Sequence, residues 1–296
     1  MHKIPVVRTI AFAYRFLIRE IGIVLGICWL PALMFSGANY LTRLYAIENR
    51  AALEINDPQT EGALFLLTVL SLAATLYASS VVAVGITRQV MGRERPPGVL
   101  LLYFAAGRSE WRMLGAYILF MLAAVGLIIA AAFVATLAFL IAGAPLTMPE
   151  RMMPTAANIA AAFVAWTALL GAFVGIVQVG FLLPPSVAMD EKGGLRRTYE
   201  LAKGNVWRLV AITVALGLPI LLLVAGAEAA IVGSALGANA ANLTPTEFLD
   251  KAGQAMEQKL GAWQIFSAIM FILGSGLIYS GAAFAYRERT APEVQP

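Results

Sequence analysis

Apolar residues fall into six long runs separated by polar segments. The runs cover residues 21–42, 62–87, 113–143, 156–184, 207–237 and 262–286. Each is long enough for an α-helix to cross the hydrocarbon core of a bilayer, which takes about 20 residues. None alternates between apolar and polar positions as the strands of a membrane barrel do. The pattern predicts an all-α, polytopic membrane protein with six transmembrane helices.

Composition agrees with one membrane domain over residues 1–296. Of these residues 60% are hydrophobic and 13% are charged, whereas a soluble domain is roughly half apolar and about a quarter charged. A soluble enzyme is therefore excluded. The single cysteine, Cys28, and the single histidine, His2, cannot form an intrachain disulfide, a multi-histidine metal site or a Ser-His-Asp triad. We predict no catalytic, cofactor-binding or metal-binding residue, no cofactor and no nucleic-acid partner.

Basic residues are distributed unequally between the connections. Sixteen of the 21 lysines and arginines precede the first run, follow the sixth, or lie between runs two and three or four and five. Because lysine and arginine are retained on the cytoplasmic side, both termini are expected in the cytoplasm. The first run, preceded by Arg15 and Arg19 and followed by no good cleavage site, is interpreted as an uncleaved signal anchor.

The two long basic connections resemble each other at an offset of 96 residues. A weaker version, an amphipathic run ending at Ile18 and Arg19, precedes the first apolar run. This pattern suggests three units, 1–92, 93–189 and 190–296, each an interfacial basic helix followed by a helical hairpin. The preference of tryptophan, tyrosine and arginine for the membrane interface can produce the same similarity without duplication. Gene duplication and independent origin therefore both stay open as interpretations. The matching positions are Gly98, Tyr103, Trp111 and Arg112 with Gly194, Tyr199, Trp207 and Arg208.

Two local signals predict helix boundaries. Thr244, Pro245 and Glu247 form a capping box, which starts a short amphipathic helix on the outer side of the membrane. Pro184 and Pro185 are expected to end the fourth membrane helix, because proline lacks the amide hydrogen that a continuing helix needs.

The segment 190–208 resembles the signature of the glycerophosphodiester phosphodiesterase membrane-domain family. This resemblance implies a six-span bundle in the bacterial inner membrane. Some members carry a phosphodiesterase domain after the bundle, which this chain is expected to lack, so no catalytic residue is carried over. A tyrosine stands where the family often has tryptophan. The matching residues are Glu191, Gly194, Arg197, Thr198, Tyr199, Leu201, Lys203, Gly204, Trp207 and Arg208.

Charged and aromatic residues near the predicted inner surface are candidates for contacts with anionic lipids. The alternative is that they only set topology. Within the apolar runs, Glu228 and Gln178 are the candidate intramembrane polar residues, although Glu228 also fits the outer interface. The lipid candidates are Arg93, Arg95, Trp111, Arg112, Arg196, Arg197, Lys203, Trp207 and Arg208.

Three functions are compatible with these features. The first is a non-enzymatic inner-membrane protein that organises, anchors or regulates, with membrane lipids and a protein partner at the inner membrane as expected partners. The second is a transporter or lipid translocator, favoured by the repeat, by Pro31 and Pro219 inside membrane helices, and by Glu228. The third is a lipid-metabolising enzyme within the membrane. The oligomeric state does not follow from the sequence.

Overall fold

A computed structural model describes residues 3–92, 107–141, 156–189, 194–237 and 244–290, and within these ranges the chain is helical without strands. Six helices are long and apolar enough to cross a membrane, as the hydrophobic pattern predicts. These are α2 (Ile21–Glu48), α4 (Pro58–Val90), α5 (Arg108–Ile141), α6 (Ala156–Gly180) with α7 (Leu183–Ala188), α9 (Val206–Leu236) and α11 (Leu260–Thr290). The shorter helices are α1 (Val6–Arg19), α3 (Arg50–Glu54), α8 (Gly194–Ala202) and α10 (Pro245–Gln258).

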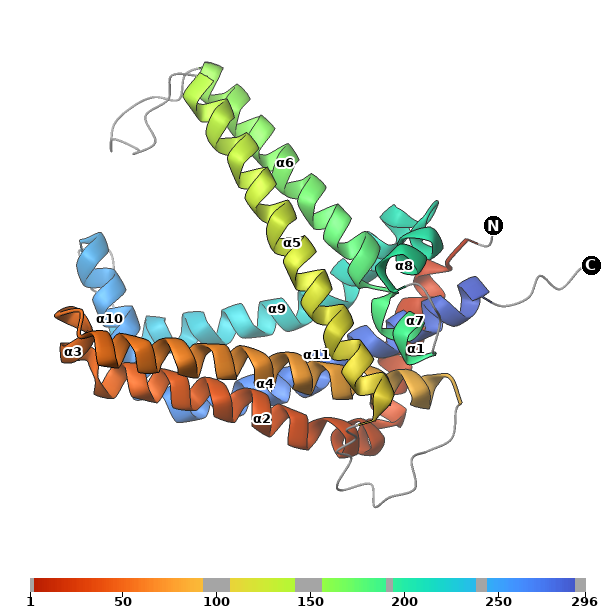
Figure 1. Ribbon diagram of the computed structural model, residues 1–296, viewed down its shortest axis with the longest axis horizontal. Coiled ribbons are helices and arrows are strands. Elements are labelled where there is room, and N and C mark those ends of the chain that lie inside the picture. Colours follow the sequence, from red (N-terminus) through yellow and green to blue (C-terminus); the bar gives the residue numbers. More distant parts are fainter. Residues whose placement is uncertain (1–2, 93–106, 142–155, 190–193, 238–243, 291–296) are drawn as a thin grey trace, which may run out of the picture.

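Helix α11 lies at the centre and packs against α1, α2, α4, α7 and α9 (Figure 1). Its second half is rich in glycine, alanine and serine, which let neighbouring helices approach closely. A Cβ atom on Gly276 would lie 2.8 Å from Cδ1 of Leu17, and one on Gly281 would lie 2.6 Å from Cδ1 of Leu216. These two glycines therefore allow α1 and α9 to pack closely on α11.

Helices α5 and α6 pack along each other and diverge from α2, α4 and α11 (Figure 1). We call this pair the arm. Its apolar side chains are mostly exposed far from the junction, Phe133 and Phe163 among them, whereas α4 and α11 bury far more of their surface. A surface of this kind is stable in contact with lipid chains rather than water.

The predicted end of the fourth membrane helix at Pro184 and Pro185 is displaced toward the preceding residues. Helix α6 ends at Gly180, and the two prolines occupy the first turn of α7. Proline is favoured there because the first amide groups of a helix have no partner within it. The missing amide hydrogen of Pro184 would otherwise have paired with the Gly180 carbonyl, which explains why the break comes four residues earlier.

Helix α1 compensates for the proline within α9. Pro219 has no amide hydrogen, so the Ala215 carbonyl lacks its usual partner one turn earlier. The Tyr14 hydroxyl donates a hydrogen bond to this carbonyl at 3.2 Å. A partly buried backbone oxygen is thereby satisfied by a residue 201 positions away in the sequence.

The capping box at the start of α10 is confirmed. The Thr244 amide and hydroxyl donate to Oε2 of Glu247 at 2.9 and 2.8 Å, and the Glu247 amide donates to the Thr244 hydroxyl oxygen. Helix α10 packs against α9 and α11, and Arg50, the first residue of α3, forms an ion pair with Glu257. Polar contacts thus join α3 and α10 at this end of the bundle.

Acidification is expected to weaken the start of α10. The hydrogen bonds from Thr244 lower the pKa of Glu247 below its ordinary value of 4.5, so its stabilising contribution is complete above pH 4.5. This contribution is lost as the pH falls through the lowered pKa. Hydrogen exchange of the α10 amides, measured between pH 3 and 7, should show faster opening only at the acid end. In a Thr244→Val variant, the α10 amides should exchange faster than in the unmodified protein at every pH, and their opening should no longer depend on pH.

Candidate functional site at the basic end

Both chain ends, together with α1, α7 and α8, lie at one end of the bundle, which we call the basic end (Figure 1). The first turn of α9 also lies there, since Arg208 contacts Ile4 just before α1, and the first turn of α5 lies beside the end of α4, since Ser109 contacts Arg88. Segments that are far apart in the sequence therefore meet around one surface. Most of the predicted lipid candidates belong to these segments.

Helix α8 and the start of α9 form a corner. The chain turns at Gly204, whose φ of +78° is accessible to glycine at little cost. The inner side of α8 is buried through Thr198, Leu201 and Ala202, and the Thr198 hydroxyl lies 3.2 Å from that of Ser186 in α7. Several residues of the predicted family signature thus position the corner itself.

The outer side of this corner carries cationic and aromatic groups. The side chain of Arg196 is 89% exposed and forms a surface ion pair with Glu200, 3.3 Å away. Lys203 is exposed, and Trp207 is 69% exposed. Tryptophan and arginine at a helix end favour the headgroup region of a bilayer.

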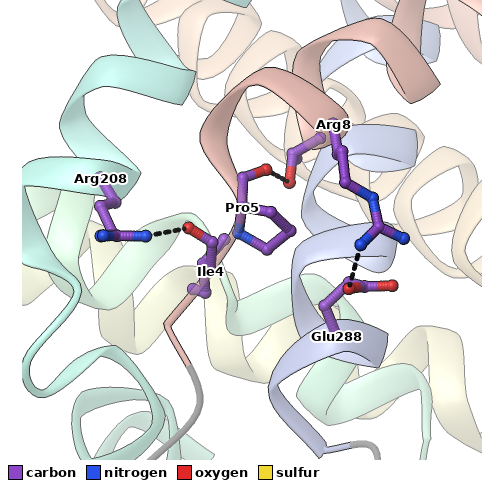
Figure 2. A network of polar contacts seen from close by, with 6 residues as sticks. Ile4, Pro5, Arg8, Arg208 and Glu288 are labelled. Atoms are coloured by element: carbon purple, nitrogen blue, oxygen red, sulfur yellow. Dashed lines mark hydrogen bonds and ion pairs between the residues drawn. The ribbon is translucent and has the colours of Figure 1, made fainter.

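Arg208 and Asn205 hold the N-terminal segment through the backbone of Ile4. Figure 2 shows the contact of Arg208 with Ile4. The Ile4 amide donates to Oδ1 of Asn205 at 2.9 Å, and Nη1 of Arg208 donates to the Ile4 carbonyl at 2.8 Å. One turn further, Arg8 forms an ion pair of 3.7 Å with Glu288 of α11. Arg208, a predicted lipid contact, therefore also has a structural role within the protein.

A polar cluster that the sequence reasoning did not single out joins α4 to α5. The Arg88 side chain donates through Nη2 to the Ser109 hydroxyl at 2.7 Å, and its Nη1 lies 3.7 Å from Oε1 of Glu110. The Ser109 hydroxyl in turn donates to Oε2 of Glu110 at 3.0 Å. The Glu110 side chain is 1% exposed, and its Oε1 accepts no hydrogen bond within the described part of the chain. A buried carboxylate with one cationic neighbour is sensitive to any change in that neighbour.

One signal for this cluster is present in the sequence. Ser109 and Glu110 lie in the first turn of α5, where a carboxylate interacts favourably with the helix dipole. Spacing alone does not bring Arg88 to them, because Arg88 lies on another helix, α4. Another polar contact, which joins α5 to α11, was also not predictable from the sequence. Here the Tyr117 hydroxyl donates to that of Tyr279 at 3.0 Å.

The remaining predicted residues are divided between the two ends of the structure. Trp111 is exposed and packs its ring 5.7 Å from that of Tyr77, while Arg112 and Arg197 are half-buried. Gln178 is half-buried in α6. Glu228 is exposed and lies in the last third of α9, far along the helix from the basic end. Arg93 and Arg95 lie outside the described residues.

No group of three or more metal-ligating side chains occurs among residues that the structure describes. No family model matches the chain, and neither the curated proteins nor the solved structures compared with it provide a match. The function is therefore inferred from the chemistry of the basic end.

Proposed function

We propose that the chain is a non-enzymatic integral protein of the bacterial inner membrane that organises or anchors components at the cytoplasmic surface and binds anionic lipids there. The observation that supports it best is the corner of α8 and α9. The corner exposes two cationic side chains and one aromatic side chain, those of Arg196, Lys203 and Trp207. The basic end, where this corner lies, also carries both termini. In this proposal the termini are cytoplasmic, the six membrane helices form three hairpins, and the resemblance to the glycerophosphodiester phosphodiesterase membrane-domain family reflects a shared bundle.

The lengths of the helices support placing the basic end in the headgroup layer. Helix α4 has 33 residues and α5 has 34, which correspond to about 50 Å each at 1.5 Å per residue. The hydrocarbon core is only about 30 Å thick, so an upright helix extends well into the polar layers. Cationic side chains at such helix ends gain about 1 kcal/mol each beside an anionic leaflet.

Lipid retention by the purified protein tests the proposal. The chain is extracted in a mild detergent, exposed to equal amounts of phosphatidylglycerol and phosphatidylethanolamine, and its bound lipids are counted by native mass spectrometry. We expect phosphatidylglycerol to be enriched. Arg196→Gln combined with Lys203→Gln should reduce that enrichment severalfold, because both cations lie on the exposed corner.

A charge-matched control separates a local contact from the net charge of the protein. Lys251→Gln combined with Lys259→Gln also removes two positive charges, but these exposed lysines lie in the middle of α10 and at its C-terminal end, away from the basic end. This variant should retain the enrichment. If the unmodified protein binds both lipids equally, the proposed lipid contact is wrong.

A lipid translocator is the second candidate, and the divergence of the arm from α2, α4 and α11 favours it (Figure 1). The separated helices expose apolar side chains along most of their length, which offers lipid chains a lateral path. Proteoliposomes containing the chain should then move a fluorescent phospholipid between leaflets faster than protein-free liposomes. Equal rates would exclude this function.

A further inference from the structure

The apolar face of helix α1 packs inside the protein, whereas its basic face is exposed. Ala13, Tyr14 and Leu17 pack on α9 and α11, so this face is not available to insert into lipid as in a free interfacial helix. The opposite face carries exposed positive and aliphatic side chains. They are Lys3, Val7, Arg8, Arg15, Ile18 and Arg19.

The arginines near α1 differ in their partners. Arg8 forms an ion pair with Glu288, and the Arg287 guanidinium lies 5.6 Å from the ring centre of Phe12 and 5.0 Å from that of Phe284. Arg15 and Arg19 are exposed and form no ion pair or hydrogen bond with their side chains in the part of the chain that is described. Because they are four residues apart on one helix, their side chains can reach a single anion.

An apolar surface continues from these two arginines onto α2. Ile18 is 74% exposed, and Ile21 and Leu25 follow at helical spacing with substantial exposure. The two helices change direction at Glu20, whose φ of −109° and ψ of 22° are not helical, but the turn is short, because the Glu20 amide donates to the Phe16 carbonyl and the Glu20 carbonyl accepts from the Val24 amide. Exposed apolar residues at the start of a membrane helix contact acyl chains.

We propose that the junction of α1 and α2 binds one anionic phospholipid, with its phosphate between Arg15 and Arg19 and an acyl chain along Ile18, Ile21 and Leu25. The two arginines favour an anionic ligand. The apolar residues beside them favour a lipid over an acidic protein segment, because a lipid also supplies an acyl chain to cover them. This inference rests on the proposed function, because it needs the basic end to face an anionic leaflet. It assigns that function a second, separate site.

Fluorescence quenching at position 18 tests this site in the full-length protein. Ile18→Cys is labelled with a fluorophore, which is selective because Cys28 is fully buried. The protein is placed in nanodiscs with lipids that carry a nitroxide on the acyl chain, either as phosphatidylglycerol or as phosphatidylcholine. Quenching at equal mole fractions should be stronger with phosphatidylglycerol. Arg15→Gln with Arg19→Gln should lower this preference by about 5- to 30-fold.

Arg8→Gln with Arg287→Gln is the charge-matched control, since it removes two charges that already have partners inside the protein. It should leave the preference within about twofold, and an equal loss in both variants would overturn the site. Inorganic phosphate added at constant ionic strength should not relieve the quenching. Relief would instead assign the arginines to a soluble phosphate.

The two proposals fail differently. If native mass spectrometry shows lipid enrichment that depends on the α8–α9 corner, but quenching at position 18 does not distinguish the two lipids, only the site at the α1–α2 junction is wrong. If neither measurement distinguishes them, the proposed function fails as well. Thermal unfolding of each variant, compared with that of the unmodified protein, shows whether a loss of preference comes from misfolding. The double variant Arg15→Lys with Arg19→Lys keeps both charges and should restore most of the preference for phosphatidylglycerol in a folded protein.

Discussion

Replacing Arg88 with alanine is expected to destabilise the protein by about 2–4 kcal/mol. Removing one partner of a buried ion pair typically costs about 3–5 kcal/mol, because the other charge stays buried without compensation. Glu110 is 1% exposed, whereas Arg88 is 31% exposed, so the loss should fall somewhat below the value for a pair buried on both sides. Ser109 also loses the donor that fixes its hydroxyl toward the carboxylate. Unfolding by SDS in mixed micelles measures this change.

Two further variants show whether burial of Glu110 causes the loss. Arg88→Met combined with Glu110→Leu removes both charges and should recover most of the stability, because apolar replacements of similar size are tolerated at buried pairs. Arg196→Ala breaks the exposed pair with Glu200 and should change the stability by less than about 1 kcal/mol. If Arg88→Ala lowered the free energy of unfolding by less than about 1 kcal/mol, Arg88 would not be what stabilises the buried Glu110 side chain.

Leu216 and Gly281 are expected to be strongly coupled. Leu216 is fully buried between α9, α1 and α11, so Leu216→Ala should cost about 2–5 kcal/mol through the cavity it leaves. Gly281→Ala alone should cost about 1–3 kcal/mol, because its Cβ would lie 2.6 Å from Cδ1 of Leu216. In the double variant the new methyl group enters the space that leucine vacates. Its loss should therefore be clearly smaller than the sum of the two single losses.

The same unfolding measurement on all four proteins gives the coupling energy. Gly217→Ala provides a control on the same helix, since a Cβ there has nothing within 4 Å apart from the helix itself. It should be neutral or slightly stabilising, as alanine is a better helix former than glycine. Additive losses for Leu216 and Gly281 would mean that α9 and α11 do not approach each other at this point.

The sequence predicted the membrane helices well because each is specified by its own composition. Six apolar runs became six long helices, and the capping box at Thr244 formed as expected because all its partners lie within one turn. The position of Gly276 and Gly281 was not predicted, since close approach depends on the side chains of other helices.

The basic end was predicted as a collection of residues and not as an arrangement. The exposed corner at Arg196 and Trp207 follows from local amphipathic spacing. The burial of Glu110 does not, because it depends on the approach of α4 and α7 to α5. Likewise, Arg208 has the local pattern of a surface residue, and only the folded chain brings Ile4 to it.

The attachment of the N-terminal segment has a consequence for the biosynthesis of the protein. Ile4 and Tyr14 are made first, yet their partners Asn205, Arg208 and Ala215 come about 200 residues later. At 5–20 residues per second, α1 waits roughly 10–40 s before these partners have been synthesised. During that interval its apolar face has no protein to cover it and must rest on the membrane surface or on a chaperone. Docking of α1 therefore cannot be completed until α9 has been synthesised.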